Sequence, residues 1–229
     1  MELAERLARL GVAAAALVEN GQTIGLGTGS TADAMIDALG RRVSEGLTVS
    51  AVVTSSQTEQ RARKNGIPVV SLDDVRELPL GIDGADEIDP NLTLIKGRGG
   101  ALLYEKLVEA CCRRFVVIAT TEKLVTNLGL RLPLPIEVIP YGWSHTANRV
   151  ASLGLSPALR RSDTGKPVVT DGGNYLLDCE RHHITDPAAL GTALKNLTGV
   201  VDHGLFIGLA TEALVIDENG EIRLIEPAS

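Results

Sequence analysis

Aromatic residues and positive charge are both in short supply in this sequence. Phe, Trp and Tyr make up 3% of its 229 residues, so aliphatic side chains must fill the interior. Lys and Arg number 22 against 29 Asp and Glu, which gives a formal net charge of -7. A nucleic-acid-binding protein normally shows a basic patch, so this balance argues against a nucleic-acid partner. It still allows a local basic pocket for an anionic metabolite.

Cysteines and long apolar runs are scarce as well. Cys111, Cys112 and Cys179 form an odd set with two adjacent members, which suits neither a disulfide framework nor a zinc motif. No apolar run reaches the roughly 18–20 residues of a membrane helix. Glu2 and Glu5 argue against a signal peptide. We therefore expect a cytoplasmic protein without a membrane partner, with cysteines that serve as small core residues.

Strand-like and helical segments alternate over the first 129 residues. The N-terminal 21 residues have the pattern of an amphipathic helix. Strand-like runs then occupy 23–27, 47–54, 67–72, 78–83 and 114–120, and helical patterns occupy 30–46, 56–66 and 99–112. Such alternation predicts a parallel sheet with helices on both faces.

The character of the sequence changes after Gly129, where LRLPLPIEVIPYGW carries three prolines. The segment 167–180 has two strand-like arms around Asp-Gly-Gly-Asn and is typical of a hairpin, and 186–197 has a helical pattern. A strand-like run follows at 204–217. We expect residues 130–203 to form a smaller α+β domain inserted into the first domain, which comprises 1–129 and 204–229.

The first glycine-rich loop, IGLGTGSTADAM, has the composition of a phosphate site. A dinucleotide loop would need a third glycine where Ser30 stands and an acid after the next strand, and a Walker A loop would need a lysine before Ser30. A helix N-terminus with free N–H groups remains, suited to a single phosphate. Ser30 and Asp33 fit a capping box, so a simple glycine turn capped by Ser30 is the alternative.

A second cluster of polar residues follows a short apolar run. Asp83 and Asp86 come where a parallel strand would end, the edge at which ligands bind in such sheets. A calcium loop is not indicated, because Ala85 stands where a ligand is required. Lys96 precedes a second glycine-rich stretch, GRGG, in which we expect Arg98 to point to solvent. An acidic surface turn is the competing interpretation.

The helical segment after GRGG carries the candidate base. Leu103, Leu107 and Cys111 form an apolar stripe, and Glu105 lies on the neighbouring row. A carboxylate at the edge of such a stripe should be partly desolvated, which raises its pKa toward the range useful for proton transfer. A solvent-exposed Glu105 is the alternative.

Taken in order, the segments GLGTGSTA, DGADEID, KGRGGALLYEK and LPLPIEVIP resemble the type A family of ribose-5-phosphate isomerases, and GVVDHGLF also fits. The resemblance implies a Rossmann-like domain with a smaller inserted α+β domain, assembled as homodimers or homotetramers. It implies interconversion of ribose 5-phosphate and ribulose 5-phosphate, a sugar-phosphate partner, and no metal or organic cofactor.

The resemblance also implies roles for individual residues. Glu105 would be the base, with Asp83, Asp86 and Lys96 as further catalytic groups. The substrate-binding set would be Thr28, Gly29, Ser30, Thr31, Asp83, Gly84, Ala85, Asp86, Lys96, Gly97, Arg98, Gly99 and Lys123. The family often has a phosphate-binding lysine in the first helix, where Leu7 stands here. Arg6 and Arg9 lie on other faces, so we leave that helix out of the site.

Two other classes compete with an isomerase. A sugar-phosphate sensor would need a helix-turn-helix, for which about 20 residues before the first strand are too few, and it has no use for a base. An amino-sugar-phosphate deaminase or a sugar lactonase would need a catalytic histidine. The four histidines, His145, His182, His183 and His203, lie outside the motifs that suggest a site, and we expect His182 and His183 on a solvated hairpin edge.

Overall fold

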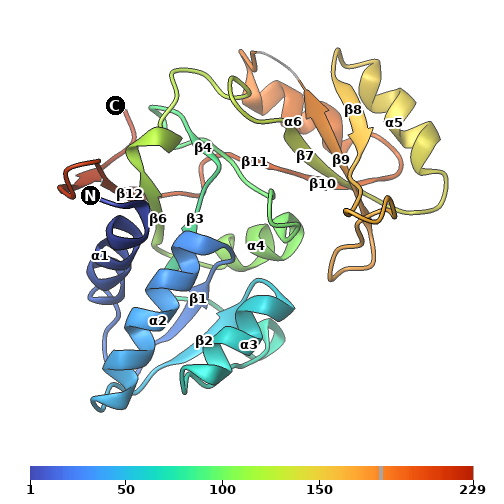
Figure 1. Ribbon diagram of the computed structural model, residues 1–229. Helices are drawn as coiled ribbons and strands as arrows, with labels where there is room; N and C mark the ends of the chain where they lie inside the picture. Colours follow the sequence, from blue (N-terminus) through green and yellow to red (C-terminus); the bar gives the residue numbers. More distant parts are fainter. Residues whose placement is uncertain (181–182, 229) are drawn as a thin grey trace.

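The computed structural model describes residues 1–180 and 183–228. A six-stranded sheet, in the order β13-β12-β6-β3-β1-β2, forms the centre of the larger part of the molecule (Figure 1). Its strands are β1 (Thr23–Leu26), β2 (Ser50–Val53), β3 (Gly81–Gly84), β6 (Phe115–Thr120), β12 (Glu212–Ile216) and β13 (Ile222–Ile225). All neighbours pair in parallel except β12 and β13, which confirms the parallel sheet expected from the alternation of strands and helices.

Helices cover both faces of this sheet. They are α1 (Leu3–Ala15), α2 (Ser30–Ser44), α3 (Ser56–Lys64) and α4 (Leu102–Glu109), with short 3-10 helices at Leu72–Asp74 and Thr121–Lys123. Helix α3 ends before Gly66, whose φ of 72° matches the expected C-terminal glycine.

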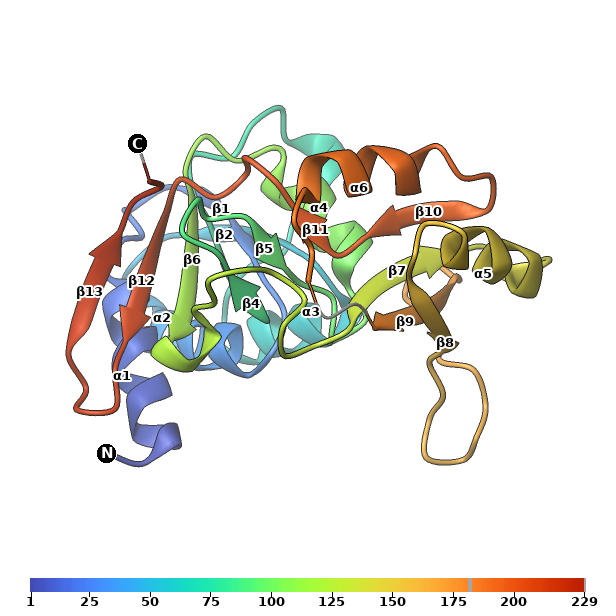
Figure 2. The same ribbon diagram turned by 90° about the horizontal axis from the view of Figure 1, so that it is seen from above.

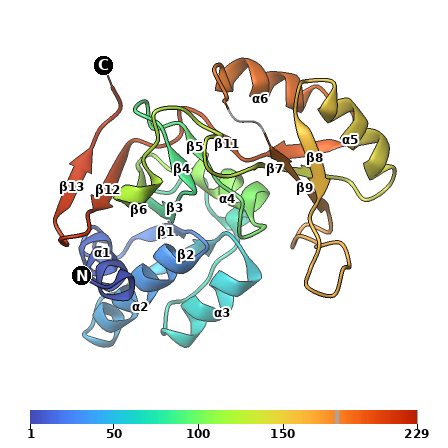
Figure 3. The same ribbon diagram turned by 45° about the horizontal axis from the view of Figure 1, so that its top comes forward.

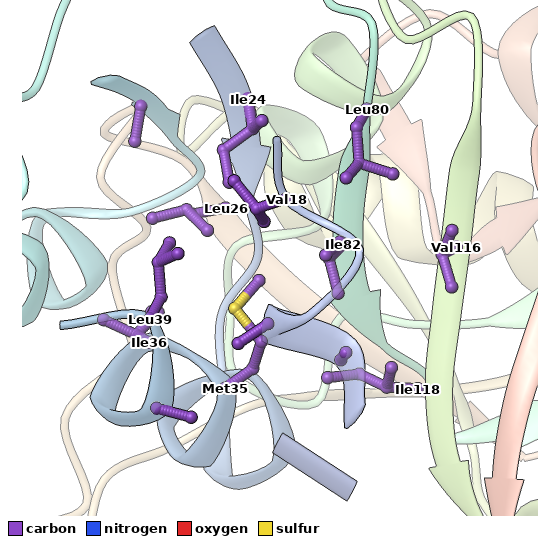
Figure 4. Packing of buried hydrophobic residues seen from close by; sticks show 14 of the residues in the cluster. Val18, Ile24, Leu26, Met35, Ile36, Leu39, Leu80, Ile82, Val116 and Ile118 are labelled. Carbon is purple, nitrogen blue, oxygen red and sulfur yellow. The ribbon is translucent and has the colours of Figure 1, made fainter. Parts of the chain in front are cut away.

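Alternation along the strands decides which helix meets which face. Val116 and Ile118 of β6 pack with Ile24, Leu26 and Ile82 against α1 and α2 (Figure 4). Phe115, Val117 and Ala119 of the same strand point to the opposite face and pack with Leu102 of α4. Because successive strand residues face opposite sides, one buried strand serves two apolar cores.

A four-stranded antiparallel sheet lies beside the large sheet, with a core of its own (Figure 2). Its order is β10-β7-β9-β8, and helices α5 and α6 pack with it. The elements are β7 (Leu134–Val138), α5 (Trp143–Ala151), β8 (Ser156–Leu159), β9 (Tyr175–Glu180), α6 (Pro187–Lys195) and β10 (Val200–His203). We propose that residues 130–203 are the inserted domain and that 1–129 with 204–229 form the first.

A small third sheet stands between the two larger ones. It pairs β4 (Glu87–Ile88), β5 (Leu94–Ile95) and β11 (Leu205–Phe206) in antiparallel fashion. Helix α4 also lies between the two larger sheets in every view (Figures 1, 2 and 3). The helix that carries Glu105 therefore lies where the two parts of the molecule meet.

Three expectations about strands need correction. The run 204–217 is not one strand but two, β11 and β12, in different sheets. The run 67–72 contributes only an isolated bridge between Val69 and Ala51. The first hairpin arm contributes only two isolated bridges, Pro167 with Arg161 and Val169 with Tyr175. Short apolar runs qualify for strands by composition, but neighbouring backbone decides which of them pair.

Candidate active site

A cavity of about 350 Å³ opens where the chain leaves the carboxyl ends of β1 and β3. Its lining residues are Thr28, Gly29, Ser30, Thr31, Gly84, Ala85, Asp86, Lys96, Gly97, Arg98, Gly99, Glu105 and Lys123. The structure thus brings together, around one cavity, every residue of the expected set except Asp83. Ligands of open parallel sheets bind at this edge.

The glycine loop between β1 and α2 forms one wall. Gly29, not Ser30, is the N-cap of α2, and no side chain caps this helix. The expected capping box of Ser30 and Asp33 is therefore wrong. Gly29 has a φ of 113°, a conformation that side-chain-bearing residues rarely adopt, so the turn is closed by backbone geometry and Ser30 becomes the first helical residue. Its hydroxyl lines the cavity, at a helix end suited to an anion.

A cluster of hydrogen-bonded hydroxyl groups fixes the position of the glycine loop at Thr28. The Oγ1 atom of Thr28 lies 2.7 Å from Thr54 Oγ1, 2.8 Å from Ser55 Oγ and 2.9 Å from Thr58 Oγ1. Thr58 in turn donates to the carbonyl of Gly27. The sequence analysis missed this cluster, because Thr28 and the stretch 54–58 lie more than 25 residues apart in the sequence. Thr28 is consequently fixed in place before any ligand binds.

Asp83 is the expected site residue that does not line the cavity. It is 1% exposed. Its Oδ1 accepts hydrogen bonds from the backbone N–H groups of Thr28 and Gly84, and its Oδ2 accepts one from Lys96 Nζ at 2.7 Å. Lys96 Nζ donates a second hydrogen bond to the carbonyl of Gly84 at 2.6 Å. Asp83 therefore joins the glycine loop to the lysine.

Helix α4 turns a different face inward from the one expected. Its buried residues are Leu102, Glu105, Val108 and Glu109, whereas Leu107 is 49% exposed. The predicted apolar stripe through Leu107 is wrong, because two carboxylates are buried where leucines were expected. Glu105 is 3% exposed and lies at the centre of the buried face, not at the edge of a stripe.

The ammonium group of Lys96 lies close to the carboxylates of both Glu105 and Glu109. Its Nζ lies 3.7 Å from Glu105 Oε2 and 3.3 Å from Glu109 Oε1. Burial alone would lower the pKa of Lys96, but the charges of Asp83, Glu105 and Glu109 outweigh burial and raise it. Burial raises the pKa of Glu105 to about 8, although the charge of Lys96 acts in the opposite direction. A carboxylate with such a pKa is a stronger base than an exposed one.

The loop 97–99 forms another part of the cavity lining and is held in place from the four-stranded sheet. The Nη1 atom of Arg160 donates to the carbonyls of Gly97 and Arg98, and its guanidinium pairs with Asp178. Sequence reasoning missed Arg160, which gives no local signal. The Arg98 side chain is exposed, as expected, while its backbone N–H donates to Asp86 Oδ2 at 3.1 Å.

The first helix contributes nothing to the cavity lining. Arg6 is 8% exposed and its Nη2 donates to Glu122 Oε1 at 2.7 Å. Hydrogen bonds from Arg6 and Thr120 lower the pKa of Glu122 to about 2. Arg6 is thus bound to the residue beside Lys123, and Leu7 remains a departure from the family pattern.

The other acidic residues of the DGADEID stretch are engaged by backbone groups. Glu87 accepts hydrogen bonds from the N–H groups of Gly129, Arg131 and Leu132, and Asp89 accepts them from Asn91 and Thr93. Over residues 1–180 and 183–228, no group of three His, Cys, Asp or Glu side chains has the arrangement of a metal site.

Histidines and cysteines lie away from the cavity lining in the described part of the chain. His203 is buried, its Nδ1 accepts a hydrogen bond from the Leu205 N–H, and burial lowers its pKa to about 4. His183 is exposed, and His182 falls outside the described residues. Cys179 is buried, as expected of a core residue, whereas Cys111 and Cys112 are half-buried. Within the described chain, no helix is both long and apolar enough to cross a bilayer.

Known proteins share both the sequence and the fold. The family model of ribose 5-phosphate isomerase A (phosphoriboisomerase A) matches residues 50–220. A ribose-5-phosphate isomerase A from Roseiflexus sp. is 49% identical over 93% of this chain and 92% of the relative, and one from Caulobacter vibrioides is 52% identical over 93% and 95%.

Solved structures agree with these relatives. A D-ribose-5-phosphate isomerase in complex with phospho-erythronic acid superposes with a TM-score of 0.95 at 36% identity, over 99% of this chain and 100% of the other. The enzyme of Methanocaldococcus jannaschii superposes with a TM-score of 0.92 at 36% identity, over 97% and 98%. Sequence, fold and cavity therefore agree, and this chain belongs to the ribose 5-phosphate isomerase A family.

Proposed function

We propose that this enzyme interconverts D-ribose 5-phosphate and D-ribulose 5-phosphate in the cavity at the ends of β1 and β3, with Glu105 as the base. One observation carries the proposal: a carboxylate that is 3% exposed lines the same cavity as a helix N-terminus suited to a phosphate. The cavity volume of about 350 Å³ is at the lower end of the range of small-ligand sites, which suits a pentose phosphate.

The phosphate is held at the glycine loop in this proposal. Gly29, Ser30 and Thr31 offer N–H groups, and Ser30 and Thr31 offer hydroxyl donors, at the positive end of α2, and Lys123 adds a cation. Thr28 lines the cavity beside them, with its own N–H donated to Asp83. Anchoring the phosphate fixes the reacting carbons at a distance from it. Orientation of this kind supplies a large share of the rate enhancement without a metal.

Proton transfer takes place at the other end of the sugar. In the open-chain aldose, Glu105 takes the proton from C2 while the electron pair of that bond moves toward C1 and its carbonyl oxygen, which gives an enediolate. Glu105 then returns the proton to C1, and the carbonyl forms at C2. The charge of Lys96, 3.7 Å from Glu105, and the N–H groups of Gly97 and Gly99 stabilise the negative oxygen.

The two aspartates take different parts in this scheme. Asp86 lines the cavity, so we assign to it the proton exchange between the two sugar oxygens and the opening of the ring. Asp83 lies beneath the lining and its oxygens are taken by Lys96 and by two backbone N–H groups. Its role is to hold Lys96 against the glycine loop.

A turnover assay with ribose 5-phosphate in the presence of EDTA tests the function. We expect formation of ribulose 5-phosphate at an undiminished rate after exhaustive chelation, because no step of the scheme uses a metal. Activity that is lost with EDTA and restored by a divalent ion would mean that the aspartates are misassigned. Turnover of an amino sugar phosphate or a lactone in place of ribose 5-phosphate would favour the alternative enzyme classes.

We further propose a cytoplasmic homodimer or homotetramer that binds no nucleic acid. Three free cysteines suit a reducing compartment, and exposed apolar side chains at Tyr104, Leu107 and Val169 offer surface for a second copy. Light scattering after gel filtration measures the assembly, and a monomer at micromolar concentration would contradict it.

A further inference from the structure

A second buried carboxyl, Glu109, lies one helical turn beyond Glu105 and has no part in the scheme above. It is 3% exposed. Neither of its oxygens accepts a hydrogen bond from any described residue, although Lys96 Nζ lies 3.3 Å from Oε1. A buried carboxylate without donors is costly, so this residue needs an explanation.

The charges around Glu109 do not balance if every acid is ionised. Lys96 is the cation in contact with Asp83, Glu105 and Glu109, and the side chains of all four are at most 4% exposed. Three carboxylates on one ammonium would leave two uncompensated negative charges in a buried site. Like charges that share a buried site do not all ionise, and one of the acids keeps its proton.

The hydrogen bonds of Lys96 point to the acid that is neutral. An ammonium has three N–H groups, and two of them are used by Asp83 Oδ2 and the Gly84 carbonyl. One N–H is left for two carboxyls, Glu105 at 3.7 Å and Glu109 at 3.3 Å. Asp83 receives three hydrogen bonds, which favour its ionised form. Both oxygens of Glu109 are buried without a hydrogen-bond partner among the described residues, whereas only Oε2 of Glu105 is, and Glu105 lines the cavity while Glu109 does not.

We propose that Glu109 is a positioning residue that stays protonated and donates its O–H to the carboxylate of Asp83. Asp83 Oδ2 and Glu109 Oε1 lie 2.7 Å and 3.3 Å from the same atom, Lys96 Nζ, so Asp83 is the ionised carboxylate next to Glu109 and the acceptor for its proton. A neutral Glu109 leaves the Asp83–Lys96 pair balanced, so the cluster carries a net negative charge only when Glu105 ionises. This assignment rests on the proposed role of Glu105 only for its catalytic consequence.

The surroundings of Glu109 agree with a neutral acid. Burial raises its pKa well above the ordinary value; Lys96 opposes this effect, and Asp83 and Glu105 add to it. The other ionisable groups that interact with it are Lys106 on its own helix and Cys112 beyond the end of that helix. Lys106 is already bonded to Asp202, so it does not supply a counter-ion for Glu109.

Infrared spectroscopy tests the protonation state without turnover. The carbonyl band of buried protonated carboxyls should be present in the wild-type protein around pH 7, where Glu105, with a pKa of about 8, also contributes to it. Glu109→Gln should remove part of this band and leave only the contribution of Glu105. The whole band should persist in the exposed control Glu45→Gln. A wild-type spectrum without such a band, or a band that Glu109→Gln leaves unchanged, would overturn the proposal. This readout is independent of activity, so it stands even where the proposed base is wrong.

The pH profile tests the consequence for Glu105. If Glu109 is neutral, Glu109→Gln replaces one neutral donor by another, and the acidic limb of kcat/KM moves by less than about 0.3 pH units. An ionised Glu109 would raise the pKa of Glu105, so its removal would move the limb down by about one unit, which would contradict the proposal. Glu109→Ala, which provides no donor to Asp83, should lose about tenfold in kcat, and Glu109→Gln should recover most of that loss.

Discussion

Gly27 and Asp83 fit together so closely that a β-carbon on Gly27 would lie 1.8 Å from Asp83 Cγ. No side chain can occupy that space while Asp83 holds the Thr28 N–H and the Lys96 ammonium. Gly27 of the glycine loop and Asp83 of β3 therefore pack directly against each other. Gly27, the second glycine of GLGTG, is therefore needed for the contacts around Lys96 as well as for the phosphate site.

The first prediction tests this packing. Gly27→Ala should push Asp83 away from Lys96 and lower kcat/KM about 100-fold, because displacements of about 1 Å at reacting groups cost that much. Gly172→Ala is the control, since its added carbon meets its neighbours at 3.4 Å or more. Steady-state kinetics with a circular-dichroism check of folding measures both. A folded Gly27→Ala with wild-type kinetics would remove the Asp83–Lys96 pair from the site.

The second prediction concerns the phosphate loop. Replacing Ser30 and Thr31 together by Ala should raise KM more than it lowers kcat, because ground state and transition state share the phosphate contact. Thr48→Ala, on an exposed loop, is the matched hydroxyl control. Initial rates over a wide range of ribose 5-phosphate concentration give both constants. An unchanged KM in the folded double variant would place the phosphate elsewhere.

Periodicity and motif order predicted much of the fold and the cavity. Parallel strands end at one edge, so the residues after β1 and β3 had to meet there, and they line the cavity with Lys96 and Glu105. The orientation of α4 could not be predicted in this way. If apolar residues alone were expected to face the interior, Leu107 would be buried. Instead Glu105 and Glu109 are buried, because they pair with the buried ammonium of Lys96.

Contacts between distant segments were also out of reach of local patterns. Arg160 braces the loop at 97–99 across more than 60 residues of sequence, and the hydroxyls around Thr28 come from the next strand and helix. Ser, Thr and Arg at these positions have no local periodicity or motif that marks them. Only the three-dimensional arrangement identifies their partners.

The third prediction addresses the contacts that join α4 to β10 of the four-stranded sheet. Lys106 Nζ donates to Asp202 Oδ1 and to the His203 carbonyl, each at 2.6 Å, and lies 4.7 Å from the centre of the Phe206 ring. Lys106→Met keeps the aliphatic stem but leaves Asp202 with the His203 N–H and, among the described residues, the half-exposed Lys195 as its remaining cation. We expect a loss of about 1–3 kcal/mol in the free energy of unfolding, measured with urea near pH 7.

The effect of that substitution should depend on pH. Burial would raise the pKa of Asp202, but Lys106 outweighs burial and lowers it below the unfolded value. The stabilisation is therefore present above the unfolded pKa and is lost as pH falls through the lowered folded pKa. An equal difference between wild type and variant at acidic and neutral pH would contradict the pairing.

The fourth prediction is the pH dependence of the reaction. A base must be ionised to accept a proton, and burial raises the pKa of Glu105 to about 8 in the empty enzyme. We expect kcat/KM to rise with pH through about 8 and to flatten above it, because kcat/KM reports the free enzyme. A profile that is flat from about pH 6 to about pH 9 would mean that Glu105 titrates like an exposed acid or is not the base.

The last prediction isolates the proton-transfer step itself. Glu105→Gln keeps the shape of the side chain and a donor toward its surroundings, but it cannot accept a proton from carbon. General-base catalysis contributes about 10²–10⁴-fold, so kcat should fall at least about 100-fold while ribose 5-phosphate still binds. In heavy water, the variant should stop incorporating deuterium at C1 and C2 of the recovered sugar, which NMR measures alongside a binding titration.

Deuterium exchange separates the competing explanations for an inactive variant. A variant that binds normally and exchanges at the wild-type rate would show that another group removes the proton, and Asp86, which also lines the cavity, becomes the candidate. A variant that neither binds nor folds is replaced by Glu105→Asp, in which the carboxylate is kept but withdrawn by one methylene. If Glu105 is the base, Glu105→Asp should retain slow exchange, because the proton acceptor remains and only its distance from the carbon has changed.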